Sequence, residues 1–289
     1  FKEFAEDTSL KGRISMGNPL TSGTTMAAVA SLSDKYGYEY FTALGNNDVM
    51  IESGSTALAK LQTGECDVIM ILEESVLKER KENGSKIACI YPDDGVILIP
   101  STGGATGMTP EERLQPTELF PEMATLDCGT CNFGGDEIFI NTDNTIANFG
   151  DIMQERGIKP ECEVFDKGMI DLALKAAKKG HIKYPIHFDF VLGVQMTATV
   201  RDLVIMATSI PADSTWTATG IGKNAWGIAA ATIAMGGHVR VGFEDNVYMS
   251  KGVLAKSNGE MVERVVQMAK LLNREVATPA EAREILGLA

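Results

Sequence analysis

The sequence predicts an α/β fold in which a TIM barrel occupies the C-terminal two thirds of the chain. Two observations support this prediction. From Gly95 onward, short apolar runs alternate with segments of helical periodicity, and Gly157, Gly180 and Gly236 stand where three of the helices should end. Six strands that are each followed by a helix are typical of a parallel sheet, and six such units make up most of an eight-unit barrel.

The expected elements of this region follow one another at regular intervals. Apolar, strand-like runs cover residues 96–101, 123–126, 161–165, 187–192, 215–219 and 238–241. Helices are expected over 145–156, 169–179, 198–209, 225–235 and 259–272, with a short one over 279–286 after Thr278. Thr109 and Pro110 mark one more helix start, because Thr caps helices and Pro suits their first position.

The first 95 or so residues follow a different pattern. Strands are expected at 13–16, 49–52, 67–72 and 87–91, and helices at 27–36, 55–61 and 76–81. These helices are shorter and the strands closer together than in a regular barrel repeat. We therefore expect two domains: an α/β segment over 1–99 that replaces or precedes the first two barrel units, and the barrel portion over 100–289.

Charge and composition exclude several classes of protein. The chain has 26 Lys and Arg against 39 Asp and Glu, a net charge of −13 that would repel nucleic acids and anionic membranes. No apolar run approaches the roughly 18–20 residues of a membrane span. The first residues are polar and acidic, unlike a signal peptide, and five scattered cysteines suggest reduced thiols. These features predict a cytoplasmic protein.

The segment 238–246 is the strongest candidate for a catalytic site. Alternation along its strand places His238 and Arg240 on one face, and Glu244 and Asp245 follow where the strand ends. Barrel enzymes carry their catalytic groups at these carboxyl ends. A structural pair between an arginine and a carboxylate at the barrel rim would give the same pattern, so both interpretations stay open on this segment alone.

Two further segments are candidates for substrate binding. Ser101-Thr102-Gly103-Gly104 follows a strand and could turn backbone amides and a hydroxyl toward an anion, although a flexible turn explains it equally well. Glu163 ends another strand and either faces a pocket or faces solvent. The lone pair Cys128 and Cys131 lacks the second pair of a zinc ribbon and is interpreted as a loop.

Several blocks of the C-terminal part resemble the β-keto acid cleavage enzymes, including those that cleave 3-keto-5-aminohexanoate. The blocks are PSTGG at 100–104, EER at 111–113, PEMATLDCGTCNFG at 121–134, EVFD at 163–166, HFDFVLGVQ at 187–195, GGHVRVGFEDN at 236–246 and LAKSN at 254–258. The resemblance implies a TIM barrel, a zinc ion and a coenzyme A thioester as substrate. In the implied reaction, a β-keto acid and acetyl-CoA give acetoacetate and a shortened acyl-CoA.

The resemblance also implies roles for individual residues. Glu244 matches the zinc-binding carboxylate, Asp245 the general base, and Arg240 the residue that orients this base. Ser101, Gly104 and Thr125 match substrate-contacting positions, and Ser101 is also a candidate catalytic residue. Glu163 matches a pocket position that could bind a substrate ammonium. These residues are the expected active site, with small molecules as partners and a homo-oligomer as the implied assembly.

One part of the implied site is missing from the sequence. The family binds zinc through a His-x-His pair on the second barrel strand together with the carboxylate. The chain has three histidines, His181, His187 and His238, and none forms such a pair. A catalytic zinc usually has three protein ligands. We therefore expect an incomplete zinc site and impaired activity.

The N-terminal segment resembles a different family. RISMGNPLTSGTT at 13–25, GSTALAKLQTGECDVIMILEES at 54–75 and IYPDDGVILIPST at 90–102 are similar to the middle of solute-binding proteins of ABC importers. The two resemblances meet at residues 100–102, which suggests a chimera joined there. The alternative functions are accordingly a solute-binding module and a chimera without function.

Overall fold

The computed structural model describes residues 1–20, 23–70, 73–87, 96–133 and 136–288. The chain divides into two compact units, Phe1–Gly95 and Val96–Ala289. Both contain parallel β-sheets with helices between the strands, so the predicted α/β class is confirmed. Each unit is described by itself below.

The N-terminal unit contains a three-stranded parallel sheet with the order β2-β1-β3. Its strands are β1 (Ile14–Gly17), β2 (Met50–Glu52) and β3 (Val68–Met70). Its helices are α1 (Lys2–Glu6), α2 (Gly23–Tyr36), α3 (Glu39–Asn46), α4 (Gly54–Thr63) and α5 (Glu73–Asn83). A small apolar core forms where Ile14 and Met16 of β1 meet Leu32, Tyr40 and Leu44.

The sequence predicted most of these elements but not all. The strands expected at 13–16, 49–52 and 67–72 and the three expected helices correspond to β1, β2, β3, α2, α4 and α5. Helices α1 and α3 were not expected. The strand expected at 87–91 falls almost entirely outside the described residues.

The C-terminal unit is built on five parallel strands that lie in their order along the chain. They are β4 (Met123–Asp127), β5 (Lys159–Val164), β6 (His187–Leu192), β7 (Thr215–Gly220) and β8 (His238–Val239). The intervening helices are α7 (Asp143–Glu155), α8 (Lys167–Lys178), α9 (Val200–Ala207) and α10 (Ala225–Ala234). Sequential parallel βα units of this kind are the repeating units of a TIM barrel.

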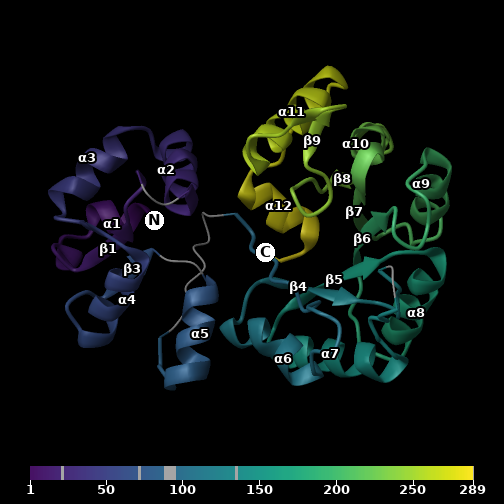
Figure 1. Ribbon diagram of the computed structural model, residues 1–289, viewed down its shortest axis with the longest axis horizontal. Helices are drawn as coiled ribbons and strands as arrows, with labels where there is room; N and C mark the ends of the chain where they lie inside the picture. Colours follow the sequence, from purple (N-terminus) through teal and green to yellow (C-terminus); the bar gives the residue numbers. More distant parts are fainter. Residues whose placement is uncertain (21–22, 71–72, 88–95, 134–135, 289) are drawn as a thin grey trace. The chain divides into compact units, whose positions relative to one another are not determined.

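One face of the five-stranded sheet is apolar and packs against helices. Residues such as Leu126, Cys162, Phe188 and Ala218 are fully buried or nearly so in one hydrophobic core with side chains from the helices. Helices α7 to α10 follow the outer side of the curved sheet (Figure 1). Because side chains alternate along a strand, the opposite face presents the residues in between.

The structure differs from the prediction at both ends of this sheet. Residues 96–101 were expected to form a strand, but they form none. The backbone N–H of Thr125 in β4 donates to the backbone oxygen of Pro100 at 3.0 Å, as it would to a neighbouring strand. Proline has no N–H to donate, so the ladder cannot continue through it. At the other end, β8 has two residues rather than the expected four.

The remaining elements lie at the periphery of the unit. Helices α6 (Pro110–Leu114) and α12 (Pro279–Leu286) begin with complete capping boxes at Thr109 and Thr278, as the sequence indicated. Helix α11 (Asn258–Leu271) also matches its prediction. The antiparallel hairpin of β9 (Tyr248–Ser250) and β10 (Val253–Leu254) was not expected.

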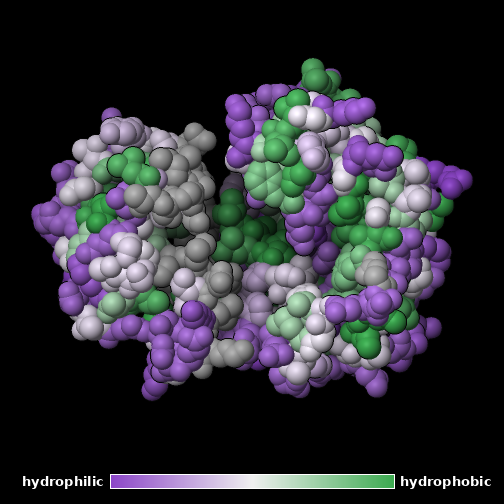
Figure 2. Space-filling view, viewed as in Figure 1, coloured by the Kyte–Doolittle hydropathy of each residue, from purple (hydrophilic) through white to green (hydrophobic). Residues whose placement is uncertain are grey.

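Exposed apolar side chains collect near this hairpin. Val253 and Leu254 are 53% and 62% exposed, and hydrophobic residues gather over the β9–α11 segment in Figure 2.

Among the described residues, every helix is too short or too polar to cross a lipid bilayer.

Candidate active site

The second face of the C-terminal sheet is lined by polar and charged side chains. The register pairs Thr125 with Glu161, Asp127 with Glu163, Glu163 with Asp189 and Thr217 with His238. The interior of a barrel is usually filled by Val, Ile and Leu. A face of carboxylates, hydroxyls and imidazoles in this position therefore identifies the candidate site.

Arg240 is the centre of this face, because its guanidinium contacts four carboxylates. Nη1 donates to Asp189 Oδ2 at 2.9 Å and to Glu163 Oε1 at 3.2 Å. Nη2 donates to Glu244 Oε2 at 3.1 Å and to Asp245 Oδ1 at 3.1 Å, while Nε donates to Asp245 Oδ2 at 3.2 Å. The pair with Asp245 is thus bidentate, which fixes the orientation of this carboxylate.

Two of the carboxyl groups that contact Arg240, those of Asp189 and Glu163, are largely buried and have raised pKa values. The side chain of Asp189 is 1% exposed, and burial together with the charge of Glu161 raises its pKa to about 7 against the attraction of Arg240. Burial, Asp127 and Asp189 raise the pKa of Glu163. Asp189 Oδ1 is buried without a hydrogen-bond partner among the described residues. Burial and mutual repulsion thus favour the protonated forms of Glu163 and Asp189, while Arg240 favours their ionised forms.

The histidines at the other end of the strands have structural partners. His187 Nδ1 lies 2.8 Å from Thr215 Oγ1, and its Nε2 lies 3.1 Å from Glu161 Oε2. His238 is partly buried, and burial lowers its pKa to about 4, which keeps the ring neutral near pH 7. His187 is buried and His238 partly buried, and both lie on the site face of the sheet.

The loop of residues 101–104 lies beside the carboxyl end of β4. Thr102 N–H donates to Thr125 Oγ1 at 3.0 Å, and Thr102 Oγ1 donates to the backbone oxygen of Thr125 at 2.6 Å. The exposed Ser101 accepts a bond from Gly103 N–H at 3.0 Å. Gly104 has φ +119°, and a Cβ there would lie 2.8 Å from Met108 Sδ, so glycine suits this turn.

The structure brings most of the expected site residues into two groups. Arg240, Glu163, Glu244 and Asp245 form the first group, described above. Ser101 and Thr125 form the second, with their hydroxyls 3.5 Å apart.

Asp127 lies between these groups in the sheet and was missed from the sequence. It pairs in register with Glu163, and a Cβ on Gly103 would lie 3.7 Å from its Oδ2. Asp189 was likewise missed as a partner of Arg240. The signal available for both was the alternation of polar residues along β4 and β6.

The described residues do not fit the zinc ion that the resemblance implies. No three His, Cys, Asp or Glu side chains among them come together as a metal-binding group. Glu244, the expected metal ligand, has a side chain that is 85% exposed, and it pairs with Arg240. A single exposed carboxylate held by an arginine lacks the donor set of a catalytic zinc.

The cysteines of the C-terminal unit are buried in its core. Cys128, Cys131 and Cys162 are free thiols, and burial raises the pKa of Cys131 to about 12. Such thiols are poor nucleophiles and metal ligands. Cys131 forms an isolated bridge with Phe139 in the loop that follows β4, as expected for a loop.

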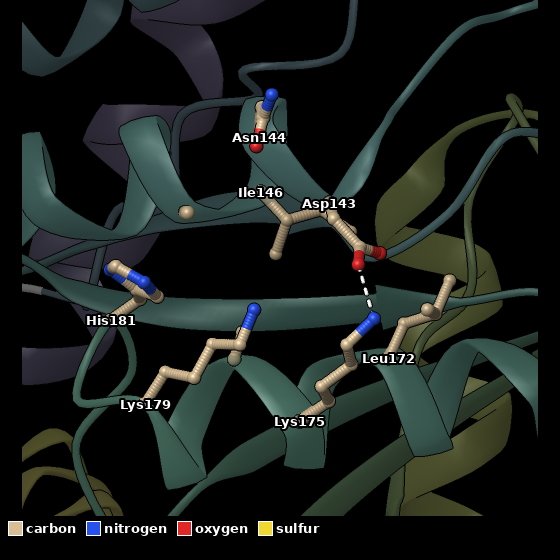
Figure 3. Close-up of a pocket in the computed structure, with 9 residues that line it drawn as sticks. Asp143, Asn144, Ile146, Leu172, Lys175, Lys179 and His181 are labelled. Atoms are coloured by element: carbon tan, nitrogen blue, oxygen red, sulfur yellow. Dashed lines mark hydrogen bonds and ion pairs between the residues drawn. The ribbon is translucent and has the colours of Figure 1, made fainter.

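A pocket outside the sheet has no part in this site. It lies between α7 and α8 and is lined by Ile146, Leu172 and Lys179 among others, with an ion pair between Lys175 and Asp143 (Figure 3). Both helices pack against the apolar face of the sheet. The pocket is therefore on the opposite side of the sheet from Arg240.

The comparisons with known proteins show the family to which the chain belongs and agree with its fold. The model of the beta-keto acid cleavage enzyme family matches residues 85–288, so the chain belongs to this family of enzymes. A "3-keto-5-aminohexanoate cleavage enzyme" of Fusobacterium nucleatum is 71% identical over 193 residues, which cover 67% of this chain and 71% of the relative. A protein of the same name from Acetoanaerobium sticklandii is 63% identical over 205 residues, covering 70% and 74%.

More distant similarity extends to other substrates and to solved structures. A "3-oxoadipate:acetyl-CoA acetyltransferase" of Cupriavidus necator is 36% identical over 200 residues, covering 67% of this chain and 69% of the relative. The apo structure of ObcA superimposes with a TM-score of 0.57 at 18% identity, covering 73% of this chain and 53% of that one. The chain thus spans about half the length of the solved structure, which shares its fold.

Proposed function

We propose that the C-terminal unit carries the chemistry of a β-keto acid cleavage enzyme. In this reaction a β-keto acid and acetyl-CoA are converted to acetoacetate and a shortened acyl-CoA. The observation that carries the proposal is the bidentate pair of Arg240 and Asp245 beside the buried carboxylates of Glu163 and Asp189. Family membership supports the same reaction.

Each residue has a proposed role that follows from its position. Asp245 is the general base, and it removes a proton from C2 of the β-keto acid to leave an enolate. C2 of this enolate attacks the acetyl carbonyl of acetyl-CoA, and coenzyme A leaves as its thiolate. The thiolate then attacks the original C3 carbonyl and breaks the C2–C3 bond, which gives acetoacetate and the shortened acyl-CoA. Arg240 holds Asp245 through two hydrogen bonds, so the carboxylate needs no reorientation when the substrate binds. Ser101, Gly104 and Thr125 bind the anionic end of the β-keto acid, since a hydroxyl and loop amides suit an anion.

The proposed substrate bears an amino group, as in 3-keto-5-aminohexanoate. Glu163 and Asp189 place carboxyl oxygens, which can accept hydrogen bonds from an ammonium group, on the site face of the sheet. The names of the relatives at 63–71% identity support this substrate.

We further propose that turnover by this chain is weak. The described residues supply Glu244 but no partners for a metal ion at the site. The Lewis acid that stabilises carbanions in such reactions would therefore be poorly held.

We also propose a homo-oligomer in the cytoplasm, and the free thiols of the four described cysteines support a reducing compartment.

The N-terminal residues 1–99 are proposed to be a segment of solute-binding-protein origin joined to the enzyme portion at Pro100–Thr102. The separate sheet and core of the N-terminal unit support a distinct segment. Titration with iron, inorganic phosphate or a polyamine tests the alternative function. Tight binding would favour a solute-binding module, and its absence would leave the enzyme proposal.

Replacement of the proposed base tests the enzyme function. We expect Asp245→Asn to lower the rate of acetoacetate formation about 10²–10⁴-fold, because loss of a positioned base has this effect. The matched control is Asp213→Asn, an exposed aspartate just before β7 at the opposite end of the sheet. The proposal is wrong if wild type forms no acetoacetate, or if both variants keep the wild-type rate.

A further inference from the structure

Arg113 is a buried arginine of α6 that the roles above leave unassigned. The residue is 5% exposed. Its Nε donates to the backbone oxygens of Thr102 at 2.9 Å and Gly103 at 3.1 Å. Its Nη2 donates to Asn141 Oδ1 at 2.7 Å and lies 3.5 Å from Asp127 Oδ2. A single guanidinium therefore connects three segments that are far apart in the sequence.

The surroundings of Arg113 favour arginine over lysine. Its guanidinium carbon lies 4.4 Å from the ring centroid of Phe139 and 5.0 Å from that of Phe149. A planar guanidinium stacks on aromatic rings while it donates several bonds in fixed directions. The ammonium of lysine could not reach two backbone oxygens, Asn141 and Asp127 in this geometry.

The bonds of Arg113 decide which way the 101–104 loop faces. They hold the carbonyl groups of Thr102 and Gly103 on the side of α6. The Ser101 hydroxyl then lies on the side of Thr125, 3.5 Å from its Oγ1. Gly104 packs on the arginine stem, since a Cβ there would lie 3.6 Å from Arg113 Cγ.

Arg113 also connects the loop to the buried carboxylate of β4. The side chains of Arg113 and Asp127 are 4% and 3% exposed. Burial raises the pKa of Asp127 to about 6, and the charges of Arg113 and Arg240 oppose this rise. Two arginines thus favour the ionised form of Asp127: Arg113, which bonds to the 101–104 loop, and Arg240, which bonds to the proposed base.

We propose that Arg113 is a positioning residue that fixes the substrate-binding loop of residues 101–104 against the carboxyl end of β4. This inference rests on the proposed function for the identity of the ligand. The placement of the loop itself rests on the contacts of Arg113 alone.

The test compares Arg113→Lys with Arg283→Lys in the full chain. Arg283 is a matched control because it is also buried, at 8% exposure, and pairs with Glu122 at the opposite end of β4. Hydrogen–deuterium exchange measures peptides from 100–108 and from β6, and isothermal titration measures the affinity for acetoacetate. Asp127→Asn, which removes the charge of one partner of Arg113 and keeps the side-chain volume, serves as a second variant.

We expect Arg113→Lys to speed exchange in the 100–108 peptide at least 10-fold while β6 keeps its protection, because the loop loses its anchor. The Kd for acetoacetate should rise by about 10–100-fold, as expected when a binding group is misplaced by about 1 Å. Asp127→Asn should produce a smaller change of the same kind, and Arg283→Lys should leave both quantities at their wild-type values.

The outcomes separate this proposal from the proposed function. Unchanged exchange at 100–108 in Arg113→Lys, or an equal rise in β6, overturns the positioning role. If wild type fails to bind acetoacetate and forms none, the proposed function fails, and the exchange data still decide whether Arg113 positions the loop.

Discussion

The two units of the chain differ in how deeply they bury ion pairs: among the described residues, the most buried pairs lie in the C-terminal unit. In the N-terminal unit, the ion pair of Arg13 and Asp67 joins side chains that are 41% and 48% exposed. In the C-terminal unit, Arg240 and Asp189 are 25% and 1% exposed, and Arg113 and Asp127 are 4% and 3% exposed. Both units have parallel sheets, and in the C-terminal one most residues on one sheet face are polar or charged, with Met123 and Val191 as apolar exceptions.

This difference shows where a functional explanation is needed. An exposed ion pair contributes about 0–1 kcal/mol and needs no explanation beyond solubility. A buried charge costs several kcal/mol of desolvation, which its partners offset only in good geometry. Clusters of buried, perturbed carboxylates are therefore typical of functional sites, and here they coincide with the residues that match the family.

The largest predicted effect on stability comes from breaking the charged centre. We expect Arg240→Met to destabilise the C-terminal unit by about 3–5 kcal/mol, because it leaves buried carboxylates without their cation. Both tryptophans, Trp216 and Trp226, lie in this unit, so urea unfolding followed by tryptophan fluorescence measures its stability.

Arg13→Met in the N-terminal unit is the matched comparison. We expect it to change stability by less than about 1 kcal/mol, because its ion pair is exposed. Circular dichroism during urea unfolding follows both units, so a transition seen there and absent from tryptophan fluorescence reports this unit, which has no tryptophan. Equal effects of the two substitutions would remove the distinction between the units.

A smaller effect is predicted for the pH dependence of stability. Asp189 has a pKa of about 7 in the folded chain and an ordinary value of 3.8, so the folded state retains a proton that the unfolded state releases. A raised pKa of this kind stabilises the fold at pH 4 and below, and the contribution is lost as the pH rises to 7. Over this range the free energy of unfolding falls by up to about 1.4 kcal/mol per pH unit.

The variant Asp189→Asn removes this contribution together with the part of the raised Glu163 pKa that Asp189 causes, and both act in the same direction. Between pH 4 and 7, the stability of wild type should fall relative to that of the variant, as measured by urea unfolding at each pH. Parallel stability profiles would show that Asp189 titrates at its ordinary pKa. His238 acts in the opposite direction in both proteins and cancels in the difference.

The sequence predicted the fold well wherever local signals were strong. Alternating βα units and capping residues such as Thr109 and Thr278 gave the class and most elements. The segment 96–101 failed because its apolar composition suggested a strand, whereas Pro100 interrupts the ladder. The hairpin of β9 and β10 was missed because it has only five strand residues, too few for a clear alternation.

The site was predictable in its local part only. Arg240 and Asp245 are five residues apart at the end of one predicted strand, and the family resemblance paired them. Glu163 and Asp189 are 77 and 51 residues away from Arg240, and only the register of the sheet shows that they meet it. Arg113 belongs to the EER block that resembles the family, but neither the block nor the helix pattern shows that its side chain is buried.

The most direct test of the proposed chemistry is the fate of the acetyl group of acetyl-CoA. The enzyme is incubated with [¹³C₂]acetyl-CoA and 3-keto-5-aminohexanoate, and the products are analysed by NMR and mass spectrometry. If the acetyl group is transferred, the label appears at C3 and C4 of acetoacetate, and the shortened acyl-CoA is unlabelled. Acetoacetate without label, or no acetoacetate at all, would contradict the assignment of this chemistry to the Arg240 centre.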